Sequence, residues 1–191
     1  MFLTAGDAFA LSARRLERIS QLIHEHLPSV QTITTYAAVR NIEAKTNEEL
    51  RHLCELGYDD LCVGIETGLD DVLTHVRKGH TTAQAIEQLK RLNAAGIRHC
   101  VTLMPGLAGT GRAEESGIAA AELANATKPL LVIPTTASVF PSTGLYGELQ
   151  RGEFVEASEA EVLEEQIAFL QVADLPHTYY WSALALNSTP V

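Results

Sequence analysis

The chain has 191 residues, 46% hydrophobic and 20% charged, which are the proportions of an ordinary globular domain. Its formal net charge of −10 disfavours binding to nucleic-acid backbones and to anionic membrane surfaces. Its three cysteines form no CxxC or CxxxCxxC pair, which excludes a disulfide framework, and free thiols in apolar segments indicate a cytoplasmic protein.

Short β-rich segments alternate with helical patterns along the whole chain. In chain order the patterns predict strands at 2–5, 30–36, 61–65, 97–104, 130–133 and 178–183, with helices between them at 16–27, 46–56, 81–95, 112–125 and 158–170. Capping boxes begin at Thr46, Thr81 and Ser158, each with Glu or Gln three residues later. Gly57 and Gly96 suit the position after the last helical turn.

This alternation predicts a parallel sheet, because strands separated by helices are joined by crossover connections. Several strands are almost entirely apolar, which indicates burial on both faces. A closed or partial barrel and an open doubly wound sheet both satisfy the pattern. The chain begins inside a strand, which is therefore either a sheet edge or the neighbour of an absent upstream unit. An exposed parallel edge could pair with a second copy of the chain.

Chemically active side chains and glycines follow the predicted strands, where ligands of parallel α/β folds bind. They are Gly6, Asp7, Tyr36, Glu66, Thr67, Gly68, Pro105, Gly106, Gly109 and residues 135–138. Together these carboxylates, hydroxyls and glycines could hold a polar ligand that carries an amine, a ribose and a carboxylate.

Each of these residues also has a structural interpretation. Asp7 could cap a turn, and the glycines after Pro105 could only mark a loop. Tyr36 is interpreted as a core aromatic residue whose hydroxyl reaches the edge. For Glu66 a functional role is favoured, because a carboxylate at the end of an apolar strand is energetically costly unless it is solvated or paired.

The remaining reactive residues form no familiar motif. Cys62 and Cys100 fall in apolar strands and are interpreted as buried packing residues. His75 and His80 belong to a helix-to-loop segment for which a solvated surface is expected. The sequence has no HExxH, GxSxG or P-loop lysine motif, and its GTG at 109–111 is not GxGxxG.

Five segments, in order, resemble the radical S-adenosylmethionine (radical SAM) superfamily, in the branch of oxygen-independent coproporphyrinogen oxidase and the methylthiotransferases. They are FLTAGDAFAL, TTYAAVRNI, VGIETGLDDVLTHVRKGHT, VTLMPGLAGTGRAE and FPSTGLYGELQRGEF. The first four are similar to the family's second to fifth strands with their following turns. The resemblance covers nearly the whole chain. It implies one domain over 1–191: a partial, open parallel β/α barrel of about five or six strands with flanking helices, without its first βα unit.

The resemblance also implies a cofactor site. The family binds S-adenosylmethionine (SAM) and a [4Fe–4S] cluster, which supplies the electron that cleaves SAM. Gly6 and Asp7 would approach the methionine amino group of SAM, and Glu66 would face its ribose or methionyl part. Arg77 and Lys78 would be drawn toward a carboxylate. The residues that would pack near the adenine are Met104, Pro105 and Gly106.

The cysteines depart from the family pattern. The family carries Cys-x3-Cys-x2-Cys after its first strand, whereas Cys54, Cys62 and Cys100 are spaced by 8 and 38 residues. No metal ligands and no cluster are therefore expected on this chain. We interpret it as a fragment or homologue of a radical SAM Fe–S oxidoreductase, truncated at its ends, that is inactive alone.

Two other functions stay open from the sequence. The chain could be a non-catalytic partial-barrel module for binding or assembly, or an unrelated α/β-barrel lyase or isomerase that uses Glu66 and Asp7 as acid and base. We expect a small-molecule cofactor as partner, no nucleic acid, no membrane, and any homo-oligomer to form through the exposed sheet edge. The substrate is not readable, since fold does not fix function.

Overall fold

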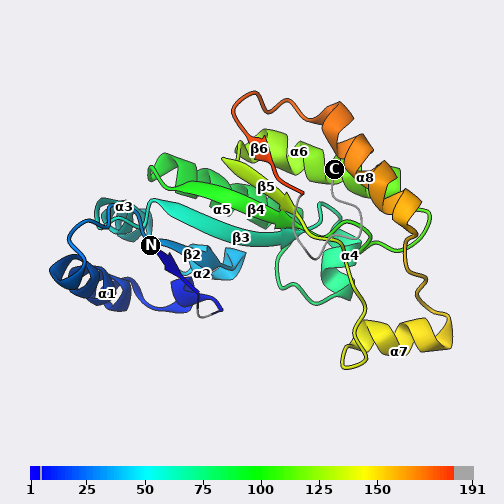
Figure 1. Ribbon diagram of the computed structural model, residues 1–191, viewed down its shortest axis with the longest axis horizontal. Coiled ribbons are helices and arrows are strands. Elements are labelled where there is room, and N and C mark those ends of the chain that lie inside the picture. Colours follow the sequence, from blue (N-terminus) through cyan, green and yellow to red (C-terminus); the bar gives the residue numbers. More distant parts are fainter. Residues whose placement is uncertain (5, 183–191) are drawn as a thin grey trace.

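A six-stranded parallel sheet forms the centre of the computed structural model, which describes residues 1–4 and 6–182 (Figure 1). Its strands are β1 (Phe2–Leu3), β2 (Thr34–Ala37), β3 (Asp60–Glu66), β4 (Arg98–Leu103), β5 (Leu131–Pro134) and β6 (Tyr179–Tyr180). The helices are η1 (Ala8–Ala10), α1 (Ala13–His26), α2 (Val39–Glu43), α3 (Asn47–Glu55), α4 (Asp70–His75), α5 (Thr82–Ala94), α6 (Ala113–Thr127), α7 (Gly144–Arg151) and α8 (Glu159–Val172).

The strand order decides between the two architectures that the sequence left open. The strands lie side by side in chain order, from β1 to β6. A doubly wound sheet reverses its strand order at a switch point, and this sheet has no such reversal. The sheet is therefore an open, partial β/α barrel, as the resemblance implied. Within residues 1–4 and 6–182, β1 pairs with β2 alone and therefore forms one edge of the sheet.

One face of the sheet is buried under the helices and forms the hydrophobic core. In Figure 1, α5 and α6 lie behind the central strands. The core side chains of the strands, such as Leu61, Val63 and Val101, are fully buried. They pack with helix residues such as Leu89 and Leu92, which recur at helical spacing. This packing fixes the direction in which the strand ends point.

The other face of the sheet is concave. One cavity of about 570 Å³ is lined by residues from Phe2 on β1 to Trp181 just after β6. Tyr36 lies on this face, is 44% exposed and packs edge-to-face on Phe2, with ring centroids 5.0 Å apart. The interpretation of Tyr36 as a core aromatic residue was therefore wrong. The face is uncovered at β1 and β2, whereas β3 and β4 are largely buried on both faces.

The helix ends agree with their sequence signatures. The capping boxes at Thr46, Thr81 and Ser158 all form, with side chain and backbone bonded in both directions. Gly57 and Gly96 take the left-handed backbone conformation that ends a helix. Strand ends were less accurate: the β2 ladder begins at Thr34, four residues after the predicted start. Among the described helices, none has the length and apolar character that a membrane crossing requires.

Candidate functional site

The carboxyl edge of the sheet brings the predicted site residues together. All six strands run in the same direction, so the segments that follow them meet at one edge. Asp7 follows β1, Glu66 ends β3 and Met104 follows β4. Glu66 and Met104 are direct neighbours, because the Met104 N–H donates to the Glu66 carbonyl at 2.7 Å. Asp7 lies two strands further along the same edge, where it contacts the end of β2.

Asp7 has one satisfied and one unsatisfied carboxylate oxygen. Its Oδ2 accepts the Ala38 N–H at 3.3 Å and a short hydrogen bond from the Asn41 amide, both just past β2. Its Oδ1 is buried and finds no hydrogen-bond partner among the described residues. A buried carboxylate oxygen without a donor is costly, so this atom indicates a place for a donor from a ligand. Gly6 before it is exposed and has φ of +68°.

Lys45 stabilises the position of the Asp7 carboxylate indirectly, through Asn41. Its ammonium is buried, donates to the Phe9 carbonyl at 2.7 Å and the Asn41 carbonyl at 3.1 Å, and lies 4.2 Å from the Phe9 ring centroid. Burial lowers the pKa of Lys45, while the charges of Glu49 and Asp7 act in the opposite direction. Lys45 therefore fixes Asn41, which in turn orients Asp7.

Glu66 sits in an uncommon backbone conformation at the end of β3. Its φ is +72°, in the left-handed region, and the β3–β4 register shifts between Gly64 and Glu66. Such conformations in residues other than glycine cluster at functional sites. The Glu66 Oε1 accepts a 2.5 Å hydrogen bond from the Lys78 ammonium, and both side chains are largely shielded.

The Glu66–Lys78 ion pair lies over Gly64. A Cβ on Gly64 would come within 2.8 Å of the Glu66 carboxylate and 3.1 Å of the Lys78 ammonium, and within 3.7 Å of the Thr102 hydroxyl. Glycine at this position therefore lets two charges and a hydroxyl gather against the sheet. The cluster offers both donors and acceptors to a polar ligand.

A buried carboxylate on α8 holds the turn after β4. The Glu165 Oε2 accepts the Gly106 N–H at 2.8 Å, and its Oε1 accepts the Ser116 hydroxyl at 2.6 Å. Ser116 in turn lies 3.5 Å from the hydroxyl of Thr67, the residue after Glu66. Burial raises the pKa of Glu165, and the two hydrogen bonds oppose that effect. Glu165 thus links the turns that follow β3 and β4.

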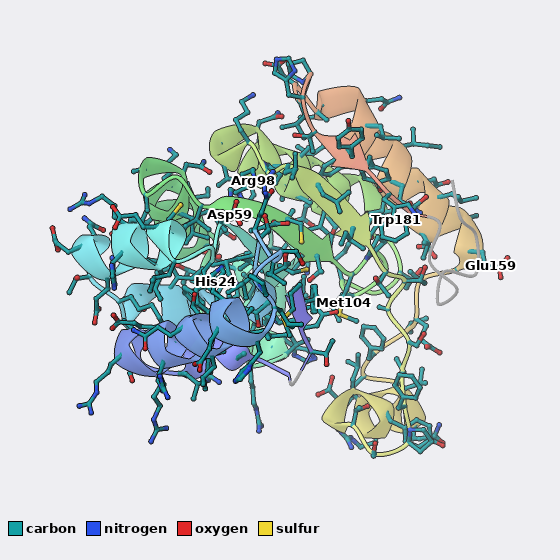
Figure 2. The ribbon with its side chains drawn as sticks, turned by 60° about the vertical axis from the view of Figure 1, so that its left-hand side comes forward. His24, Asp59, Arg98, Met104, Glu159 and Trp181 are labelled. Atoms are coloured by element: carbon teal, nitrogen blue, oxygen red, sulfur yellow. The ribbon has the colours of Figure 1, made fainter. Side chains whose placement is uncertain are left out.

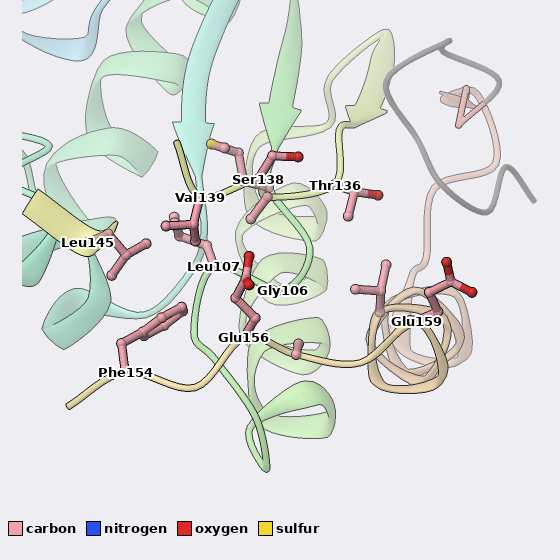
Figure 3. Close-up of a pocket in the computed structure, with 13 residues that line it drawn as sticks. Gly106, Leu107, Thr136, Ser138, Val139, Leu145, Phe154, Glu156 and Glu159 are labelled. Atoms are coloured by element: carbon pink, nitrogen blue, oxygen red, sulfur yellow. The ribbon is translucent and has the colours of Figure 1, made fainter. Parts of the chain in front are cut away.

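A cavity of about 380 Å³ opens beside this turn (Figure 3). Met104, Gly106 and Leu107 from the turn after β4 form one wall. The other walls come from the segment after β5, α7, and the approach to α8; the residues labelled there in Figure 3 are Thr136, Ser138, Val139, Leu145, Phe154, Glu156 and Glu159. Pro105 is buried below, and its carbonyl accepts the Ala137 N–H at 2.9 Å. The cavity has a mixed apolar and carboxylate lining.

The opposite edge of the sheet, where the strands begin, carries an ion pair. Asp59 and Arg98 lie together there, 3.4 Å apart, far from Met104 in Figure 2. The residues predicted to bind SAM lie at the carboxyl edge, and none lies at this amino edge, whereas Tyr36 lies within β2 on the concave face.

The described residues do not form a metal centre. Within 1–4 and 6–182, no three Cys, His, Asp or Glu side chains converge in a way that could hold a metal ion. Cys54 is on α3, and Cys62 and Cys100 are on β3 and β4. The cysteines present therefore do not fit a [4Fe–4S] cluster, which takes three or four thiolates. That the chain binds no cluster remains a prediction.

Sequence reasoning missed the side chains that support this edge. Asn41 and Lys45 contact residues 34 to 36 positions earlier, and Glu165 contacts Gly106 across 59 positions. Such contacts leave no local spacing signal: Asn41 and Lys45 fall between the predicted strand 30–36 and the predicted helix 46–56, and Glu165 falls within the predicted helix 158–170. The Lys78 ammonium pairs with the Glu66 carboxylate, a contact that the sequence did not indicate. That Arg77 and Lys78 are drawn toward a carboxylate of the ligand stays a prediction.

Comparison with known proteins gives a consistent result. The family model described as the radical SAM superfamily matches residues 1–117. A tRNA uridine(34) acetyltransferase of Methanocaldococcus jannaschii is 26% identical over 118 residues, covering 61% of this chain and 22% of that protein. The heme chaperone HemW of Bacillus subtilis is 26% identical over 110 residues, covering 57% of this chain and 29% of that protein. The chain thus spans less than a third of the length of these two relatives.

Solved structures show the same fold. An archaeal Elp3 from Methanocaldococcus infernus superposes with a TM-score of 0.74 at 16% identity, covering 100% of this chain and 49% of that one. Coproporphyrinogen III oxidase (HemN) from Escherichia coli, described as a radical SAM enzyme, superposes with a TM-score of 0.68 at 19% identity, covering 89% and 40%. With the family match over more than half of its residues, this chain belongs to the radical SAM superfamily.

Proposed function

We propose that this chain is the SAM-binding part of a radical SAM Fe–S oxidoreductase and that it cannot cleave SAM by itself. The Oδ1 of Asp7, which has no hydrogen-bond partner among the described residues, carries the proposal. It is a buried acceptor at the end of β1, where the family resemblance places the methionine amino group. An ammonium group would satisfy it with a charge-assisted hydrogen bond.

The other candidate residues at the carboxyl edge of the sheet fit other parts of the same ligand. The Glu66–Lys78 pair offers an acceptor and a cation to the ribose hydroxyls or the methionyl carboxylate. Met104 and Gly106 line the 380 Å³ cavity and, with the buried Pro105 between them, offer an apolar wall for the adenine. In the family, the cluster supplies the electron for SAM cleavage. The residues of this chain would bind and orient SAM.

Calorimetric titration of SAM into the metal-free chain tests the binding half of the proposal. We expect one SAM per chain, and about 10-fold to 100-fold weaker binding for Asp7→Asn, since a hydrogen bond to a charged group is worth about 1.5–3 kcal/mol. Asp174→Asn is the matched control, because Asp174 lies before β6 at the amino edge and is largely exposed. Equal affinity of Asp7→Asn and the unaltered chain would refute the assigned role of Asp7.

Anaerobic reconstitution tests the second half. The chain is incubated with iron and sulfide, reduced, and studied by electron paramagnetic resonance. We expect no stoichiometric [4Fe–4S] signal and no 5′-deoxyadenosine from added SAM, because the three cysteines do not come together at one site within the described residues. A stoichiometric cluster signal on this chain would contradict the proposal even if SAM binds as expected.

A further inference from the structure

Two cysteines on the concave face are direct neighbours across the sheet. Cys62 on β3 and Cys100 on β4 are register partners in the parallel ladder. Register partners on adjacent strands are about 4.8 Å apart, and their side chains point to the same face. Both are free thiols and both line the 570 Å³ cavity of the concave face. They therefore present two sulfur atoms side by side to one cavity.

Both cysteines are buried, as their apolar strands suggested, but they are buried on the concave face. Neither cysteine belongs to the helix-covered core that holds Val63 and Val101, their strand neighbours. The cavity that they line runs on to the exposed aromatic rings of Phe2 and Trp181. The thiols are only 5% and 8% exposed as residues, so a ligand would reach them through this cavity.

The two thiols also interact with each other. The Cys100 thiol lowers the pKa of Cys62, and the same contact, together with burial, raises the pKa of Cys100. This is the behaviour of two thiols in contact, and it is independent of any proposed role at the carboxyl edge.

The surroundings restrict the kind of ligand. Asp60 lies on the same face, and its charge raises the pKa of both cysteines. Burial raises the pKa of Asp60 itself. An additional net negative charge would therefore be unfavourable here, which disfavours a univalent cation held by two thiolates. Leu131, Ile133 and Trp181 offer apolar surface for an organic substituent.

We propose that Cys62 and Cys100 form a two-thiol site for a soft, thiophilic centre that forms a neutral adduct with both sulfur atoms, of the class of trivalent organoarsenicals. Soft centres prefer thiolate ligands, and two thiols already side by side bind as a chelate. With phenylarsine oxide, two sulfur–arsenic bonds form and the arsenic–oxygen bond breaks. The oxygen leaves as water with both thiol protons, and arsenic stays trivalent.

Phenylarsine oxide is the probe for the test, with 2,3-dimercaptopropanol as the competitor. We expect one arsenical per chain. The quantity measured is the competitor concentration that displaces half of the arsenical. In Cys62→Ser and in Cys100→Ser this concentration should fall at least about 100-fold, because the chelate is lost. Cys54→Ser is the matched control, because Cys54 lies on α3 and contacts neither thiol; its Sγ faces Gly96. Its competition curve should equal that of the unaltered chain.

Peptide mapping of the unaltered chain keeps the test independent of how the variants fold. The arsenical should link the two peptides that contain Cys62 and Cys100. Adducts on Cys54, or unchanged retention in both single serine variants, would overturn the proposal. Because the site involves no SAM, failure here would leave the proposed function unaffected, and the reverse also holds.

Discussion

At the scale of single residues, buried polar groups carry most of the information about this molecule. Glu165 is a carboxylate with two protein donors, and it joins the turns after β3 and β4 through Gly106 and Ser116. His99 is the opposite case: it is 1% exposed, and neither ring nitrogen has a partner in the described part of the chain. Glu165 should therefore affect the geometry of the carboxyl edge, and His99 should affect how the stability of the fold depends on pH.

Replacing Glu165 with Leu should loosen the turn after β4. The Gly106 N–H and the Ser116 hydroxyl would lose their acceptor while still buried, which costs about 1–3 kcal/mol for each such group. We expect a lower melting temperature and faster hydrogen exchange of the Gly106 amide. Glu165→Gln should restore most of the protection, because its amide can serve both partners. Glu164→Leu, one position earlier on the exposed side of α8, is the control and should leave Gly106 protected.

His99 should make the fold less stable as the pH falls below 6.5. Burial lowers the pKa of His99 to about 4, so the folded state resists protonation. The unfolded chain takes up the proton near pH 6.5, which favours unfolding, and stability is lost progressively toward pH 4. We expect His99 to account for about 2–3 kcal/mol of this loss between pH 6.5 and 4.5.

Urea unfolding at several pH values measures this effect. His99→Leu should have a smaller loss of unfolding free energy over the same interval, and His26→Gln, an exposed residue at the end of α1, should follow the unaltered chain. A part of the loss should persist in His99→Leu, because burial also lowers the pKa of His80 to about 4. Identical slopes for His99→Leu and the unaltered chain would show that His99 is not buried as described.

At the scale of helices and strands, the sequence predicts where a helix or strand occurs better than it predicts how closely two helices pack. The capping boxes at Thr46, Thr81 and Ser158 are local patterns, so they could be found from spacing alone. The close approach of α6 and α8 could not. From the sequence alone, Gly117 is expected to lower the stability of the helix that contains it. In the structure, a Cβ there would come within 2.3 Å of the Glu165 carbonyl oxygen.

Gly117→Ala should therefore separate α8 from α6. The clash is with backbone, which cannot move aside as a side-chain end would. Overpacking of this kind costs about 1–3 kcal/mol, more than the gain in helix propensity. Gly144→Ala at the start of α7 is a matched control, because no atom lies within 4 Å of its added Cβ. Thermal melts should show destabilisation in the first variant and a neutral or stabilising effect in the second.

At the scale of the whole molecule, the alternation of strands and helices predicted the parallel sheet, and the resemblance predicted its barrel-like order. The carboxyl edge also followed from the strand pattern, since Asp7 and Gly106 follow strands and Glu66 ends one. The concave face did not. Whether Tyr36 is covered depends on how far the sheet curves and closes, which no local pattern records. Exclusion of nucleic acid and assembly through the β1 edge remain predictions.

Amide chemical-shift mapping with SAM tests the central claim most directly, because it reports where the ligand binds as well as whether it binds. We predict that SAM shifts the amide signals of Gly6, Asp7, Glu66 and Gly106, while Asp59 and Arg98 at the amino edge stay unchanged. Shifts confined to the amino edge, or none at saturating SAM, would contradict the account.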